Sequence, residues 1–122
     1  MSKFYDFIQC QVGLHPCGMS NKYCQIGHTF CLKTPEIEGI YWFYETDQFI
    51  INIDDFFIKK EQVNTSFPDM SPFLSFCSTY IITGNGESFN PYQTLSANSL
   101  YVIDTKSTKD YNFLLHANFP FL

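Results

Sequence analysis

The sequence contains no arginine, and its seven lysines face twelve acidic residues. The formal net charge is therefore -5, and the sequence pI is about 4.9. A surface of this sign repels phosphate groups, so we expect the chain by itself not to bind nucleic acid. Any contact with DNA would have to come through another domain or subunit.

Long apolar runs are also missing. No stretch approaches the roughly 20 apolar residues that a membrane helix requires, and the first residues lack the order of a signal peptide. We therefore predict a cytoplasmic protein without membrane contact. A chain of 122 residues that is 45% hydrophobic, with a mean hydropathy of -0.10, is long enough for one core and too short for two. The sequence predicts a single domain.

The five cysteines are an odd number, which excludes complete disulfide pairing within one chain. Four of them follow one another at intervals of seven residues: Cys10, Cys17, Cys24 and Cys31. Glycine and proline interrupt any helix that would align them, and no two lie at the spacing of a structural zinc site. We expect buried free thiols and no bound metal.

Aromatic residues are abundant, at 19% of the chain against 16% charged residues. The densest run, residues 39–60, holds the only tryptophan and many β-branched residues, which fit a pleated and largely buried surface. Its polar break at Thr46, Asp47 and Gln48 predicts a hairpin that joins strands 40–45 and 49–53. Asp54 and Asp55 predict a bend, after which residues 56–58 resume as a third strand or continue the second.

Further short apolar runs alternate with turn residues along the chain. Strands are expected at 23–34, 73–83, 100–103 and 111–116, and turns or loops at 13–21, 35–39, 61–72, 84–87 and 104–110. Residues 1–12 have a mixed period that suits a helical turn or an edge strand. This spacing is typical of an all-β sandwich or barrel. The apolar ending at 118–122 favours a chain cut from a longer polypeptide, with a C-terminal strand as the alternative.

The run from Gly39 to Glu45, followed by residues 49–60, resembles the first strands of the N-terminal, cupin-like domain of AraC-family transcriptional regulators. The segment from Pro72 to Cys77, the turn at Gly84 and the strand 100–103 occur in a similar order, so that the resemblance covers residues 25–122. It implies a cupin-like double-stranded β-helix, or jelly-roll barrel, over 23–122. Residues 1–22 would form an N-terminal arm, with or without a short helix, and a loop. It also implies that a helix-turn-helix DNA-binding domain, absent here, follows in a longer polypeptide.

Catalytic cupins bind a metal through a short string of histidine and glutamate residues. The three histidines, His15, His28 and His116, lie far apart, and none belongs to such a string. No cysteine, histidine and aspartate occur in a recognisable nucleophile motif either. We therefore predict no catalytic residue, no metal and no cofactor.

Six residues are candidates for contact with a small-molecule effector because they combine large rings with a few polar atoms. They are Trp42, Tyr44, Phe76, Tyr80, Tyr101 and His116. Two interpretations stay open, since the same rings could simply fill a small barrel. Exposed members could instead form a dimer face.

The function that the sequence favours is effector binding and dimerisation in an AraC-type transcriptional regulator, without catalysis. The partners would be an effector of unknown identity, a second copy of the chain, and DNA only through the further domain. Two alternatives remain: a small metal-dependent cupin enzyme, and a β-sheet domain that binds a partner without any ligand.

Overall fold

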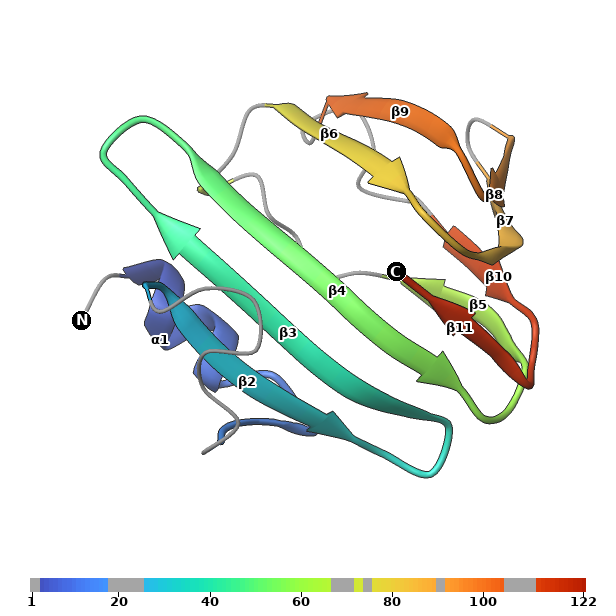
Figure 1. Ribbon diagram of the computed structural model, residues 1–122, viewed down its shortest axis with the longest axis horizontal. Helices are drawn as coiled ribbons and strands as arrows, with labels where there is room; N and C mark the ends of the chain where they lie inside the picture. Colours follow the sequence, from blue (N-terminus) through green and yellow to red (C-terminus); the bar gives the residue numbers. More distant parts are fainter. Residues whose placement is uncertain (1–2, 18–25, 67–71, 74–75, 90–91, 105–111) are drawn as a thin grey trace.

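The computed structural model describes residues 3–17, 26–66, 72–73, 76–89, 92–104 and 112–122. Within these residues the chain forms one short helix, α1 (Lys3–Gln9), and eleven strands in three antiparallel sheets (Figure 1). The prediction of an all-β protein is confirmed. No sheet of the described part closes into a barrel. None of its helices is long and apolar enough to cross a membrane.

The first sheet is centred on a long hairpin. Its strands, in spatial order, are β1 (Leu14–Pro16), β2 (His28–Lys33), β3 (Ile37–Glu45), β4 (Ile50–Ile58) and β11 (Phe119–Phe121). β3 and β4 have nine residues each and pair along their whole length, from Ile37 opposite Ile58 to Glu45 opposite Ile50. At the turn, the Thr46 hydroxyl accepts the amide hydrogens of Gln48 and Phe49 at 3.2 and 3.1 Å. This is the hairpin that the sequence predicts.

Two smaller sheets lie beside the first one. The four-stranded sheet has the order β5 (Gln62–Ser66), β10 (Asn112–Leu115), β7 (Asn85–Phe89) and β8 (Gln93–Ser96), and the two-stranded sheet pairs β6 (Phe76–Ile81) with β9 (Ser99–Asp104). In Figure 1 β6 and β9 face the middle of β4, whereas the four-stranded sheet lies near β11. Predicted strands 100–103 and 111–116 correspond to β9 and β10.

One face of the β3–β4 hairpin is the interior of the molecule. Strand side chains alternate between two faces, and the register places Phe43, Tyr41, Gly39 and Ile37 on the same face as their cross-strand partners. Two clusters of buried side chains pack on this face. We call them the helix-side cluster, comprising Phe4, Ile8, Phe30, Tyr41 and Phe43, and the sheet-side cluster, comprising Ile58, Ile81, Leu95, Phe113 and Leu115. Phe56 packs against both.

The bend predicted at Asp54 and Asp55 is wrong, because β4 runs without interruption from Ile50 to Ile58. Asp54 pairs with Tyr41, and Asp55 pairs with Ile40. In a strand two adjacent carboxylates point to opposite faces, so neither interrupts the pairing with β3. The backbone hydrogen bonds of the long hairpin outweigh the turn preference of two aspartates.

The turn predicted at 84–87 is also wrong. Asn85 to Phe89 form β7, and the chain bends earlier, at Ile82 and Thr83. Gly86 serves a close approach of two strands, because a Cβ atom there would collide with the carbonyl oxygen of Leu114 in β10.

Three other predicted boundaries shift. The loop expected at 13–21 contains β1, the turn at 35–39 is shorter because β3 begins at Ile37, and the loop at 61–72 contains β5. The expected strand 23–34 is observed as β2, and its residues 23–25 lie outside the described part. In each case pairing with a neighbouring strand extends regular structure into residues that favour turns. The N-terminal segment forms the helix α1, one of the two options that its pattern allows.

Cys17 and Cys31 form a disulfide with a Cα–Cα distance of 5.7 Å. The pairing of β1 with β2, which places His15 opposite Cys31, brings the two residues together. Of the cysteines that the structure describes as free, Cys10 is exposed and Cys77 is half-buried. The prediction of buried free thiols is therefore wrong for Cys10, Cys17 and Cys31, whereas Cys24 lies outside the described residues. Spacing along the chain could not reveal a contact that depends on strand pairing.

Candidate functional site

A group of polar side chains lies on the interior face, at the border between the two clusters. Tyr41 of β3 and Asp54 of β4 are direct cross-strand neighbours, so that their Cβ atoms are roughly 5 Å apart. Next to Tyr41 on this face is Gly39, which has no side chain, and beyond it Ile37 packs against the sheet-side cluster. The hairpin therefore presents a phenol and a carboxylate at one place between two apolar regions.

Asp54 is half-buried and weakly compensated. Its closest partner of known geometry is Asn52, whose Nδ2 donates to Oδ1 at 3.4 Å, a long hydrogen bond. Burial raises the pKa of the Asp54 carboxyl to about 6, and the hydrogen bond from Asn52 lowers it by less. Burial disfavours the charged form of a carboxyl group, so a positively charged partner would stabilise the ionised Asp54 side chain.

Tyr41 is only 9% exposed. Its hydroxyl forms no hydrogen bond with another described residue. Every fully buried polar side-chain atom of the described part has a hydrogen-bond partner, so the Tyr41 hydroxyl must be accessible to solvent. Burial raises the pKa of the Tyr41 phenol, and negative charge on Asp54 and on Cys77 raises it further. Tyr41 therefore stays protonated and presents both a donor and an acceptor to the space beside it.

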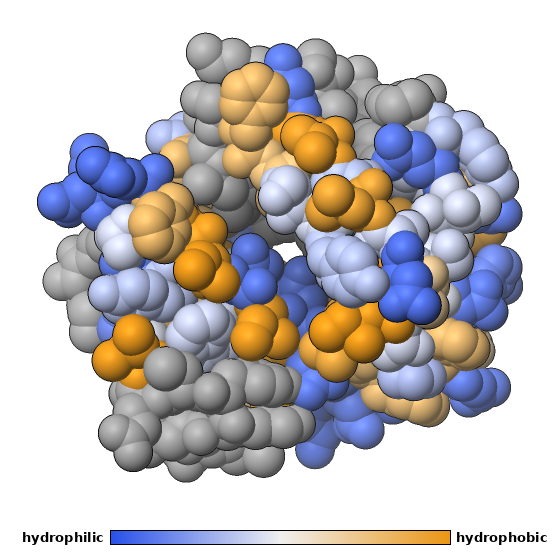
Figure 2. All heavy atoms as spheres, turned by 45° about the horizontal axis from the view of Figure 1, so that its top comes forward, coloured by the Kyte–Doolittle hydropathy of each residue, from blue (hydrophilic) through white to orange (hydrophobic). Residues whose placement is uncertain are grey.

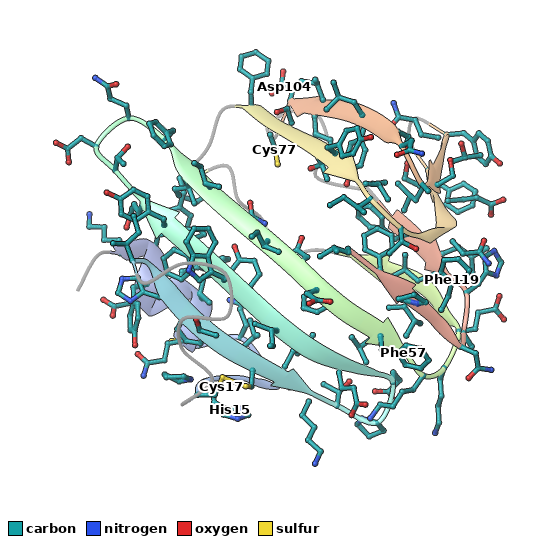
Figure 3. All side chains as sticks on the ribbon, viewed as in Figure 1. His15, Cys17, Phe57, Cys77, Asp104 and Phe119 are labelled. Carbon is teal, nitrogen blue, oxygen red and sulfur yellow. A yellow bond between two sulfur atoms is a disulfide. The ribbon has the colours of Figure 1, made fainter. Side chains whose placement is uncertain are left out.

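Cys77 reaches the same space from β6. In Figure 3 its sulfur points from β6 toward β4. Thr79, the next inward residue of β6, lies with Oγ1 at 3.8 Å from the Cys77 sulfur. Both side chains are half-buried. We call Tyr41, Asp54, Cys77 and Thr79 the interior polar group.

The surface near these strands is hollowed. Figure 2, which turns β6 and β9 toward the reader, shows a hollow near the middle of this face, bordered by hydrophilic and hydrophobic residues. Two shallow grooves of about 260 and 290 Å³ lie elsewhere, at the β3–β4 turn beside Phe73 and on the outer face beside Phe57 and Pro120. Neither groove is lined by the interior polar group.

The candidate residues on β3 lie on the opposite, outer face of the hairpin. Trp42 is buried, and its Nε1 donates to the carbonyl oxygen of Ile26 at 3.0 Å. Gly27 makes this contact possible, because its φ is +91° and a Cβ there would lie 2.7 Å from the Trp42 Nε1. Tyr44 shares this face and is half-buried. The indole nitrogen of Trp42 is thus already occupied.

The four other candidates are spread over three places. Phe76 and Tyr80 lie on the outer face of β6, 70% and 56% exposed, and the Tyr80 hydroxyl donates to Asn98 at 2.9 Å. Tyr101 faces inward from β9 and packs against the sheet-side cluster. His116 follows β10, and its Nδ1 lies 3.2 Å from Oε1 of Glu61. The six predicted residues do not meet at one site.

Tyr41, Asp54 and Cys77 are absent from the sequence-based candidates. A signal for Asp54 exists, because a carboxylate in the middle of the strand-like run 49–58 must face either solvent or the interior. The alternation in 73–83 also places Cys77 and Thr79 on one face with Ile81. Which face is interior depends on the sheet that covers it, and the alternation within one segment does not reveal that sheet.

The side chains of the interior polar group can donate and accept hydrogen bonds and include one acidic group. The group offers one carboxylate, two hydroxyls and a thiol, and no histidine or lysine contacts it in the described residues. No three of the His, Cys, Asp and Glu side chains in the described part lie together in a way that could hold a metal ion. Comparison of the chain with protein-family models, curated proteins and solved structures gave no match.

Proposed function

We propose that the chain is a non-catalytic, ligand-sensing and dimerisation domain of the type found at the N-terminus of AraC-family regulators. The observation that supports this most directly is Tyr41, which is only 9% exposed and stands beside the half-buried carboxylate of Asp54, while its solvent-accessible hydroxyl forms no hydrogen bond with a described residue. A hydroxyl in this position can exchange its contact with water for a hydrogen bond to a bound small molecule. The cupin-like double-stranded β-helix remains part of this proposal.

Ligand binding would act by joining two sheets. Tyr41 and Asp54 belong to the first sheet, and Cys77 and Thr79 belong to the two-stranded sheet. A molecule that contacts both would favour the conformation in which β6 and β9 are drawn against β4, and so would shift the population of states. In a longer regulator this shift would change how attached helix-turn-helix domains are presented to DNA.

The dimerisation part of the proposal is supported by the outer face of the two-stranded sheet. Phe76, Tyr80, Leu100 and Val102 project from it, and each is at least 56% exposed. Exposed apolar patches of this kind often mark protein–protein contacts. Sedimentation of the purified chain should therefore show a concentration-dependent dimer. A strict monomer at all concentrations would contradict this part.

The test of ligand sensing compares the wild type with Tyr41→Phe in a thermal-shift screen. Sugars, aromatic acids, amines and short peptides are added separately, and a ligand that binds the folded state raises the melting temperature. We expect at least one class to stabilise the wild type more than Tyr41→Phe. Tyr44→Phe is the matched control, because Tyr44 lies on the outer face. If no compound gives a shift that depends on Tyr41, the proposal fails.

The exposed face also favours a second candidate function, a β-sheet domain that binds a partner protein and no ligand. That function predicts no shift in the screen together with loss of association in Phe76→Ser.

The metal-dependent enzyme alternative requires a bound metal, and elemental analysis of the purified protein would detect it. A cytoplasmic location is part of the proposal. Disulfides are rare in that compartment, and the Cys17–Cys31 disulfide is the observation that speaks against this location.

A further inference from the structure

We infer that the interior polar group binds a small organic cation, a protonated amine, with Asp54 as its counter-ion and the Tyr41 hydroxyl as its second contact. This inference rests on the proposed function, since it names the chemical class of the ligand for the same site. It starts from the juxtaposition of an unpaired carboxylate, a phenol and aromatic rings on the inner face of one hairpin.

The carboxylate of Asp54 has no cationic partner among the described residues. In the part of the chain that the structure describes, no lysine pairs with it, and its polar contact is the long hydrogen bond from Asn52. Lys59 is paired with Glu38 at 3.4 Å on the outer face of the hairpin. A half-buried carboxylate without a cationic partner is destabilising when it is ionised, and a positively charged ligand would remove that penalty.

Aromatic rings flank Asp54 on the interior face of the hairpin. Tyr41 stands opposite Asp54, and Phe56 follows two residues later on the same face of β4. Aromatic rings attract a cation to their faces, and the attraction grows when the site excludes water. Carboxylate and rings together suit an ammonium group with a short hydrocarbon chain, which can also pack against the apolar clusters on both sides.

The interior polar group disfavours an anionic ligand. The groups that face this space are Tyr41 from β3, Asn52 and Asp54 from β4, Cys77 and Thr79 from β6, and Tyr101, opposite Thr79, from β9. None of them carries a positive charge. A phosphate or carboxylate ligand would be repelled by Asp54, whereas an ammonium can donate one N–H to Asp54 and others to the hydroxyl oxygens of Tyr41 and Thr79.

The experiment uses three cationic probes, n-butylammonium, agmatine and choline, and a neutral comparison, n-butanol, each at about 10 mM in a thermal-shift assay, with affinity then measured by calorimetry. The key variant is Asp54→Asn, which keeps the shape and removes the charge. Asp55→Asn is the matched control, because Asp55 is the next residue of the same strand and faces outward. At least one cation should stabilise wild type and Asp55→Asn, and bind Asp54→Asn about tenfold more weakly.

The pH dependence supplies an independent readout. Because burial holds the pKa of Asp54 at about 6, a proton competes with the cation below that pH. Affinity for the cation should therefore fall by about tenfold per pH unit well below pH 6 in the wild type. In Asp54→Asn the remaining affinity should be independent of pH over this range.

The outcomes separate the two levels of the proposal. Equal binding of n-butanol, or equal binding of the cations to Asp54→Asn, overturns the cation inference. If a sugar or another neutral compound stabilises the wild type and depends on Tyr41, the cation inference falls and the sensor proposal stands. If neither the cations nor any neutral class gives a shift that depends on Tyr41, both are wrong.

Discussion

The helix-side and sheet-side clusters differ in chemistry and in what covers them. The helix-side cluster is built from stacked and edge-on rings, with Phe4 4.9 Å from Phe43 and 5.5 Å from Phe73 between ring centroids. Four of the five residues in the sheet-side cluster are aliphatic. The seven-residue helix α1 covers the first, and strands of two other sheets cover the second.

This difference shows how one sheet can support regions of unequal stability. A helix of two turns has little stability of its own, so α1 depends on Phe4 and Ile8, its buried side chains. The strands over the sheet-side cluster are held by backbone hydrogen bonds as well as by packing. We therefore expect the helix-side region to open locally before the sheet-side region does.

The largest effect should come from the ring at the centre of the helix-side cluster. Phe43→Ala should lower the free energy of unfolding by about 4 kcal/mol, because it removes a fully buried ring and leaves a cavity. Chemical denaturation measures the loss. Leu95→Ala in the sheet-side cluster is the comparison, with an expected loss of about 3 kcal/mol. Hydrogen exchange should show that Phe43→Ala opens α1 selectively, and equal opening of β7 and β10 would remove the distinction.

The disulfide gives the second effect. Its two cysteines are 14 residues apart and join the end of β1 to β2, beside the helix-side cluster. Reduction, or the pair Cys17→Ser and Cys31→Ser, should cost about 3 kcal/mol in the chain-entropy description. Denaturation with and without a reducing agent measures it, and Cys10→Ser is the control because Cys10 is exposed and free. Protection of the β10 amides from hydrogen exchange should be unchanged if the helix-side and sheet-side regions open independently.

Asp54→Asn should stabilise the protein by about 1 to 2 kcal/mol above pH 6, less than a full conversion of the pKa shift because the side chain is partly exposed. The folded pKa of about 6 lies above the unfolded value of about 3.9, so the folded state binds the proton more tightly. Wild-type stability should therefore fall as pH rises from about 4 to 6 and then level off. Denaturation at several pH values tests this. Asp55→Asn should keep the wild-type profile, and an unchanged profile in Asp54→Asn would contradict the interior position of Asp54.

The smallest effect on stability is expected outside both clusters. Phe76→Ser should change the free energy of unfolding by less than about 0.5 kcal/mol, because the side chain is 70% exposed. It should nevertheless weaken self-association in sedimentation experiments. Phe57→Ser, on the outer face of β4, is the control for a general loss of surface apolarity. A large loss of stability in Phe76→Ser would place that ring in a core.

The sequence predicts the all-β class and the central hairpin because local alternation and aromatic density carry that information. It does not predict which face of a strand is covered, since this depends on sheets formed by distant segments. Asp54 illustrates the problem, because an aspartate in a strand and one at a bend look alike until β3 is known to pair through residue 58. The same applies to Cys17 and Cys31, and to the interior positions of Tyr41 and Cys77. The aromatic candidates rest on residue type alone, and the structure disperses them over both faces.

Backbone hydrogen bonds at β11 and Leu122 connect the first sheet to the end of β6. β11 pairs with β4, and the amide and carbonyl groups of Leu122 bond to Thr83 and Ile82, directly after β6. A shift of β6 relative to β4 would therefore lengthen the backbone hydrogen bonds between Leu122 and residues 82 and 83. A ligand that moves β6 in the interior would thus strain the backbone at Leu122, at the opposite side of the first sheet from α1.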